Sequence, residues 1–207
     1  LQPFSTATHL TRDAQPETLI ATQCKNLPRD IVETSISKAF IEGEHEASRL
    51  WADRRNAAPR ELGPFVAYGI AWSARREDIQ AIALYDRNAI GGGDLVMIGA
   101  AVGIETLISL RPFTPAHAAD IRLWAEGFRQ RFPRDPLGYM PGNLFHLWHG
   151  AFEHRYYRAR NRVLIEHGYD PARDLALAEN GAWRWRDPHG ALAGALSGYF
   201  ASRREDG

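Results

Sequence analysis

Three consecutive glycines, Gly91 to Gly93, lead directly into one carboxylate, Asp94, and an apolar segment follows. Glycine adopts positive φ angles without strain and lets a ligand approach the backbone closely. A carboxylate at the start of a helix is held in its charged form, because the helix macrodipole is positive at that end. Such an acid can take a proton from a substrate hydroxyl, so Asp94 is a candidate general base. The alternative is that Asp94 only caps the helix and that the glycines supply the turn.

Two histidines form a second candidate site. The segment FHLWHG places His146 and His149 three residues apart. Neutral imidazole is a common ligand for borderline metal ions, but two histidines without a nearby pair of carboxylates make an incomplete site. The spacing also differs from that of the zinc proteases. A pair with a purely structural role is the alternative.

A third candidate is the arginine-rich segment HRYYRARNR, which contains Arg155 and Arg158. The planar guanidinium group suits phosphate, so these two arginines are candidate diphosphate ligands. A solvated helix face has the same composition and is the alternative. The glycine stretch itself is not a phosphate-binding loop, because it lacks both the Lys-Ser/Thr ending and the G-x-G-x-x-G pattern.

Composition removes several classes of protein. The 207 residues carry 25 basic and 25 acidic side chains, and a formal net charge of zero gives no electrostatic support for nucleic-acid binding. No apolar run approaches the ~20 residues that span a bilayer, so no transmembrane segment is expected. The one cysteine, Cys24, cannot form an internal disulfide, which favours a cytoplasmic location. Nothing in the sequence indicates an oligomeric state.

The elements that would position these residues alternate between helix and strand, which predicts a single α/β domain over residues 1–207. Strands are expected at 18–24 and 65–74, a strand leading into a loop at 143–150, and a hairpin within 170–187. Helices are expected at 29–55, 75–86, 95–110, 114–132, 154–168 and 188–206. Thr114 followed by Pro115 is typical of a helix start.

The segment GIAWSARREDIQAIALYDRNAIGGGD, residues 69–94, resembles the acceptor-side segment of GT-A fold glycosyltransferases of the large family-two type. The resemblance is carried by a glycine, an Ala-x-Arg-Arg-like phrase, a Leu-Tyr-Asp phrase and the closing glycine-rich loop. The matching residues are Gly69, Ala74, Arg75, Arg76, Leu84, Tyr85, Asp86 and Gly91 to Asp94. The phrases YMPGNLFHLWHG, GYDPARDL and GAWRW resemble a bacterial branch of the same proteins.

The resemblance implies a GT-A-like mixed sheet flanked by helices, with a helical C-terminal extension, and transfer of a sugar from a nucleotide sugar to a saccharide or other acceptor. It implies that Asp94 is the catalytic base, that Trp72, Gly92 and Gly93 contact the acceptor, and that His146 or His149 completes a Mn²⁺ or Mg²⁺ site. Many members of the family have Glu where this chain has Gly93, so one acceptor contact differs.

The chain also departs from the family, because the Asp-x-Asp motif that holds the metal ion occurs nowhere in its sequence. The segment LQPFSTATHL resembles the strand that comes shortly after that motif. The chain therefore resembles about the C-terminal two-thirds of such an enzyme, and we expect it to be inactive without the donor-binding half. The metal ion is expected only in the complete enzyme. A non-catalytic carbohydrate- or protein-binding module derived from the same fold is the main alternative. A histidine-dependent metal hydrolase is a further one, disfavoured because no third ligand is recognisable.

Overall fold

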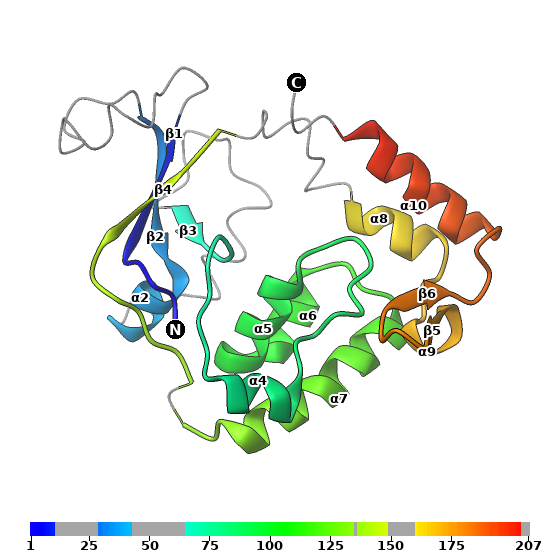
Figure 1. Cartoon of the computed structure of the whole chain (residues 1–207), viewed down its shortest axis with the longest axis horizontal. Helices are drawn as coiled ribbons and strands as arrows, with labels where there is room; N and C mark the ends of the chain where they lie inside the picture. Colours follow the sequence, from blue (N-terminus) through cyan, green and yellow to red (C-terminus); the bar gives the residue numbers. More distant parts are fainter. Residues whose placement is uncertain (11–28, 43–64, 135, 149–159, 204–207) are drawn as a thin grey trace. The chain divides into compact units, whose positions relative to one another are not determined.

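The computed structural model describes residues 1–10, 29–42, 65–134, 136–148 and 160–203 (Figure 1). These residues form a small mixed sheet, a short hairpin and several helices, which confirms the α/β class. Contacts divide the chain into two compact units. The first comprises Leu1–Arg75 and Arg134–Gly150, and the second comprises Arg76–Pro133 and Ala151–Gly207. The single domain expected from the sequence stays a prediction.

The first unit is built on a four-stranded sheet. Its strands are β1 (Thr6–Leu10), β2 (Arg29–Ser35), β3 (Phe65–Ala67) and β4 (Asn143–His146), in the order β3-β2-β1-β4. The strand β1 runs antiparallel to β2 and parallel to β4, while β3 runs parallel to β2. The sheet is therefore mixed, and β1 lies between β2 and β4.

The core of the first unit is small and combines apolar and polar contacts. Phe4, Ala7 and Ala67 form a buried cluster against which Leu144 packs. The buried Gln2 amide donates to the carbonyl of Ala67 at 3.0 Å and accepts from the backbone N–H of Ser37, also at 3.0 Å. This amide therefore satisfies two buried backbone groups on different segments, which offsets the cost of its own burial.

Two predicted elements of the first unit are corrected. The helix expected at 29–55 is wrong for its first residues, which form β2, and within the described residues only α2 (Ile36–Ile41) is helical. Pairing with β1 overrides the helical spacing, because tertiary contacts commonly outweigh local propensity. The strand expected at 65–74 covers only Phe65–Ala67. The strand expected at 18–24 lies outside the described residues.

The second unit is mainly helical. Its helices are α4 (Arg76–Ile82), α5 (Gly93–Val102), α6 (Ile104–Leu110), α7 (Pro115–Arg131), α8 (Arg160–Glu166), α9 (Pro171–Asp174) and α10 (Ala191–Ser202). Its hairpin pairs β5 (Leu175–Leu177) with β6 (Trp183–Trp185) in antiparallel fashion, as the sequence predicts. No helix in the described part of the chain is long and apolar enough to cross a membrane.

One long helix expected in this unit, at 95–110, is instead two helices. Gly103 separates α5 from α6 with a φ angle of 145°, which other residues rarely adopt. Gly99 lets the two helices pack closely, because a Cβ at this position would lie 2.6 Å from Cδ2 of Leu107. Figure 1 shows α5, α6 and α7 packed together as one helical group.

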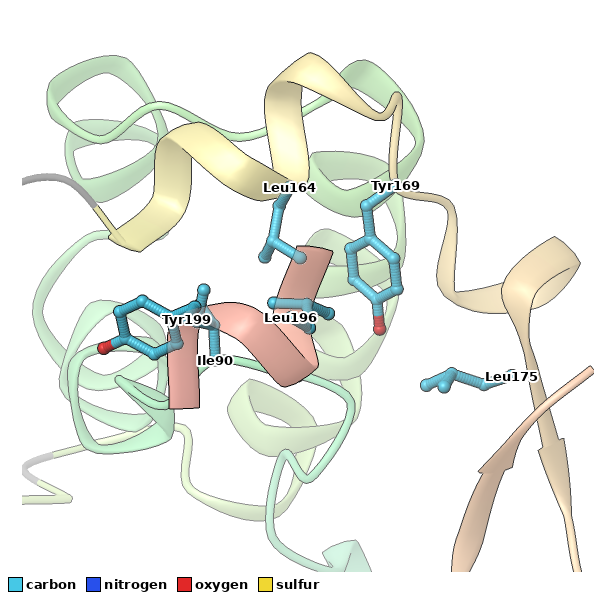
Figure 2. Packing of buried hydrophobic residues seen from close by; sticks show 6 residues of the cluster. All are labelled: Ile90, Leu164, Tyr169, Leu175, Leu196 and Tyr199. Atoms are coloured by element: carbon cyan, nitrogen blue, oxygen red, sulfur yellow. The ribbon is translucent and has the colours of Figure 1, made fainter. Parts of the chain in front are cut away.

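A buried cluster joins the C-terminal helices to the loop before α5 (Figure 2). The cluster consists of Ile90, Leu164, Tyr169, Leu175, Leu196 and Tyr199. Trp183 and Trp185 of β6 pack against it from the hairpin. Ile90 is only 1% exposed and directly precedes the three glycines, so the start of the glycine loop is anchored in this core.

Candidate functional site

Asp94 lies in the first turn of α5, where the sequence places it, and its side chain is half-buried. The residue that caps this helix is Gly92, in a left-handed conformation with φ 90° and ψ 18°, and no side chain caps the helix. Asp94 is therefore not the N-cap residue, and a purely structural role in the first turn of α5 stays the alternative to a role as base. The carboxylate lies in the first turn of α5, at its N-terminal end.

Each of the three glycines before Asp94 has its own structural reason. Gly91 and Gly92 have φ angles of 87° and 90°, which favour glycine. A Cβ at Gly93 would lie 3.0 Å from the backbone oxygen of Tyr85, so the close approach of two backbone segments excludes a larger residue without movement. The family's Glu at this position would meet the same obstacle here.

Arg160, the first residue of α8, lies over the glycine loop. A Cβ at Gly91 would lie 3.1 Å from its Nη1 atom, and a Cβ at Gly92 would lie 2.9 Å from its Nη2 atom. The guanidinium group therefore covers the bare backbone that leads to Asp94. Arg155 and Arg158, which were predicted from the same arginine-rich segment, both lie outside the described residues. The missed signal was that small residues let a planar guanidinium approach the backbone.

The chain before the loop is fixed by a hydrogen-bonded cluster around Asp120 of α7. The Tyr85 hydroxyl and the Arg87 Nε group both donate to Oδ2 of Asp120, each at 2.8 Å. The Tyr169 hydroxyl donates to the backbone oxygen of Arg87 at 2.6 Å. The backbone oxygen of Tyr85 also lies against Gly93. This cluster and the buried side chain of Ile90 therefore fix the segment from residue 85 to residue 93 at several points.

Burial controls the protonation of this cluster. Burial raises the pKa values of the Tyr85 and Tyr169 hydroxyls above their usual range, with the Asp120 charge adding to the effect. Both phenols are therefore neutral donors at physiological pH. This cluster has no signal in the sequence, because Asp120 and Tyr169 lie dozens of residues from Tyr85 and Arg87.

His117 packs against the same cluster as a buried, neutral ring. It is 1% exposed, and neither ring nitrogen has a hydrogen-bond partner among the residues that the structure describes. Its ring lies edge-on to Phe113 and Tyr169 with centroids 5.1 Å apart in both pairs, and it stacks on Tyr85 at 6.2 Å. Burial lowers the pKa of His117 to about 4, and the opposing effect of Asp120 is smaller.

Trp72, predicted to contact an acceptor, is half-buried in the first unit, and its indole Nε1 donates to the backbone oxygen of Tyr68 at 2.9 Å. The indole N–H is thus used internally, and the ring rather than the N–H is available for stacking. Ile70, two residues earlier, has a φ angle of 72°. This conformation is costly for a β-branched residue and marks a locally strained segment.

His146 ends β4 in the first unit, and its ring lies beside that of His9 on β1, with centroids 4.7 Å apart. His149 lies outside the described residues. Trp72 and His146 belong to the first unit, whereas Gly92, Gly93 and Asp94 belong to the second. Within the part of the chain that the structure describes, no group of three or more His, Cys, Asp or Glu residues could hold a metal ion.

Comparisons with protein-family models, curated proteins and solved structures found no match. The resemblance to the GT-A fold glycosyltransferases therefore rests on the sequence motifs alone.

Proposed function

We propose that this chain supplies the acceptor-side, catalytic portion of a glycosyltransferase that uses a nucleotide sugar, with Asp94 as the general base. The observation that carries the proposal is the local geometry of Asp94. It follows two left-handed glycines at the start of α5, it does not cap the helix, and its loop is held by Asp120, Tyr85 and buried Ile90. A base held this firmly is preorganised for proton transfer.

The reaction would be a direct displacement at the anomeric carbon. The acceptor hydroxyl oxygen attacks that carbon while the bond between the carbon and the diphosphate oxygen breaks, and configuration inverts. Asp94 takes the hydroxyl proton, and the nucleoside diphosphate leaves with the bonding electron pair. Acceptor contacts at Gly92 and Gly93 are proposed from the resemblance, and at Gly92 they require the Arg160 side chain to move aside.

The departing diphosphate needs positive charge. Arg155 and Arg158 remain the proposed contacts, and Arg160 in the same segment already lies over the glycine loop. The residues described here do not fit the Mn²⁺ or Mg²⁺ that the resemblance implies. The neighbours of His146 supply one further imidazole and one carboxylate, whereas these hard cations prefer several oxygen ligands. No step above depends on a metal ion.

The test measures both binding and transfer. Calorimetry with UDP and GDP measures nucleotide affinity, and transfer is measured as nucleoside diphosphate release from a panel of nucleotide sugars with mixed saccharide acceptors. Both are measured on this chain and on the same chain extended upstream in its gene. The variant Asp94→Asn should abolish transfer and leave nucleotide affinity within about twofold, because the amide keeps the shape and cannot accept the proton.

The matched control is Glu126→Gln, which removes an exposed carboxylate on α7 in the same unit and should leave transfer unchanged. If Asp94→Asn weakens nucleotide binding as much as it weakens transfer, the carboxylate is not the base. Saccharide binding without any response to nucleotides, in either form of the chain, would favour a non-catalytic binding module.

A further inference from the structure

One turn of the first unit, residues 68–73 directly after β3, has a strained backbone. Ile70 has a φ angle of 72°, and the backbone N–H of Ala71 donates to the carbonyl of Gly69 at 3.0 Å. A hydrogen bond between residues two apart, around a central φ of about +75°, defines the rarer and strained form of the γ-turn. A β-branched residue is an outlier in this conformation, whereas glycine adopts it without strain.

The strain persists because the chain is fixed on both sides of the turn. Ala67, just before the turn, is 2% exposed in the buried cluster with Phe4, and Ala71 packs against the same cluster. The backbone N–H of Ser73 donates to the carbonyl of Leu1 at 2.8 Å. Fixed surroundings of this kind are the condition under which a costly backbone conformation survives in a folded protein.

The Ile70 side chain offsets little of this strain, because it is 39% exposed and contributes less to folding than a buried isoleucine. Glycine at this position would remove the strain and lose only that partial burial. Folding alone is therefore a poor reason for an isoleucine here. Strained residues that folding does not account for cluster at binding and catalytic sites.

Trp72 supplies a second apolar group on the same turn. Its indole Nε1 donates to the backbone oxygen of Tyr68 at 2.9 Å, so the indole reaches back across the turn whose central residue is Ile70. This bond fixes the orientation of the ring, and Trp72 is only half-buried. An aromatic ring and an aliphatic side chain that are both held in place before binding lose little conformational entropy when a ligand arrives.

We propose that Ile70, presented by the strained turn, contacts the apolar C–H face of a sugar ring that stacks on Trp72. A sugar ring carries C–H groups on its faces and hydroxyl groups around its edge, so its face suits an apolar contact of this kind. The choice of a saccharide rests on the proposed function, in which Ile70 then helps to select the acceptor. Both residues belong to the first unit, so the contact is described without reference to Asp94.

The first measurement tests the strained turn with two substitutions that differ in backbone freedom. Urea unfolding compares Ile70→Gly with Ile70→Ala, since both remove the side chain and only glycine relieves the positive φ angle. Ile70→Gly should have the higher unfolding midpoint. The matched control is the same pair at Ile79, which is also 39% exposed but lies inside α4, where alanine should have the higher midpoint. A higher midpoint for Ile70→Ala would overturn the strained turn and the proposal with it.

The second measurement tests saccharide binding and requires no transfer. Saturation-transfer NMR with methyl glucoside, methyl galactoside and methyl mannoside identifies a glycoside that binds the unaltered chain, and titration gives its affinity. Ile70→Gly, Ile70→Ala and Trp72→Ala should each weaken this affinity at least about fivefold, as expected for the loss of a central apolar contact. Ile79→Ala should leave it unchanged.

The outcomes separate this contact from the proposed function. If a glycoside binds the unaltered chain and both Ile70 variants equally well, the contact at Ile70 is wrong and the proposed sugar transfer is untouched. If none of the three glycosides binds the unaltered chain, the sugar contact is overturned. In both cases the transfer assay of Asp94→Asn still decides the role of Asp94.

Discussion

His117 should make this protein sensitive to acid in a narrow range of pH. Its ring is buried among Tyr85, Phe113 and Tyr169, and burial lowers its pKa to about 4 from an ordinary value of 6.5. Below pH 6.5 the unfolded chain therefore binds a proton that the folded protein does not. Stability falls as the pH decreases from 6.5 to about 4, and below that this group causes no further loss.

The size of the effect follows from the shift. A difference of about 2.5 pKa units corresponds to about 3 kcal/mol of unfolding free energy, at about 1.4 kcal/mol per unit. A loss of this size is a large fraction of the stability of an ordinary domain. The neighbouring charges act in opposite directions, because Asp120 raises the pKa of His117 and Arg87 lowers it.

The variant His117→Phe isolates this contribution. Phenylalanine suits a site lined by aromatic rings in which neither imidazole nitrogen has a hydrogen-bond partner from the described segments. The hydroxyl of Thr114 accepts from the backbone N–H of residue 117, so the helix cap survives the substitution. Urea unfolding at a series of pH values gives the unfolding free energy of each form. Between pH 6.5 and 4 the unfolding free energy of the wild type should fall by about 3 kcal/mol more than that of the variant.

A control variant separates this site from general acid effects. His189→Gln removes an exposed histidine, and its stability should follow the wild type at every pH. If His117→Phe and the wild type lose stability in parallel between pH 6.5 and 4, His117 is not held neutral and its described environment is wrong.

Two further predictions concern the glycine loop and its support. Gly92→Ala should destabilise the protein by about 1–3 kcal/mol, because residue 92 has a φ angle of 90° and the new Cβ would lie 2.9 Å from the Arg160 guanidinium. Gly127→Ala, in the middle of α7 with nothing within 4 Å, is its control and should instead raise stability by up to about 1 kcal/mol. Asp120→Ala should cost about 3 kcal/mol, because it leaves the Tyr85 hydroxyl and the Arg87 guanidinium without their acceptor. Asp120→Asn keeps an acceptor and should cost less. Urea unfolding at pH 7 checks these values, and equal losses for the two Asp120 variants would contradict the assigned hydrogen bonds.

Elements with a strong local signal were predicted correctly. The helix α7 begins where Thr114 and Pro115 indicate, and the Thr114 hydroxyl accepts from the backbone N–H of His117 as an N-cap does. The hairpin β5–β6 and the helix α10 are also where composition and turn residues place them. These features depend on neighbouring residues, so the sequence carries the information for them directly.

Elements formed by distant partners were not predicted from the residue pattern. The strand β1 was expected only from the family resemblance, and β2 was taken for part of a helix, because both are strands only by virtue of their pairing with each other and with β3 and β4. The break at Gly103 was missed for a related reason, since an apolar run with one glycine resembles an unbroken buried helix until packing is known.

The sequence by itself determined that Asp94 follows a glycine loop at a helix start, since both glycine and the helix signal act over a few residues. Only the tertiary structure decided that Asp94 does not cap the helix, that Arg160 covers the loop, and that Tyr85 and Asp120 support it. The register of β1 with β2 and β4 likewise brought His9 and Glu33 to His146. Such groupings depend on which distant segments pair with each other. The pairing in turn depends on the burial of side chains throughout the unit, and a local pattern of residues does not contain that information.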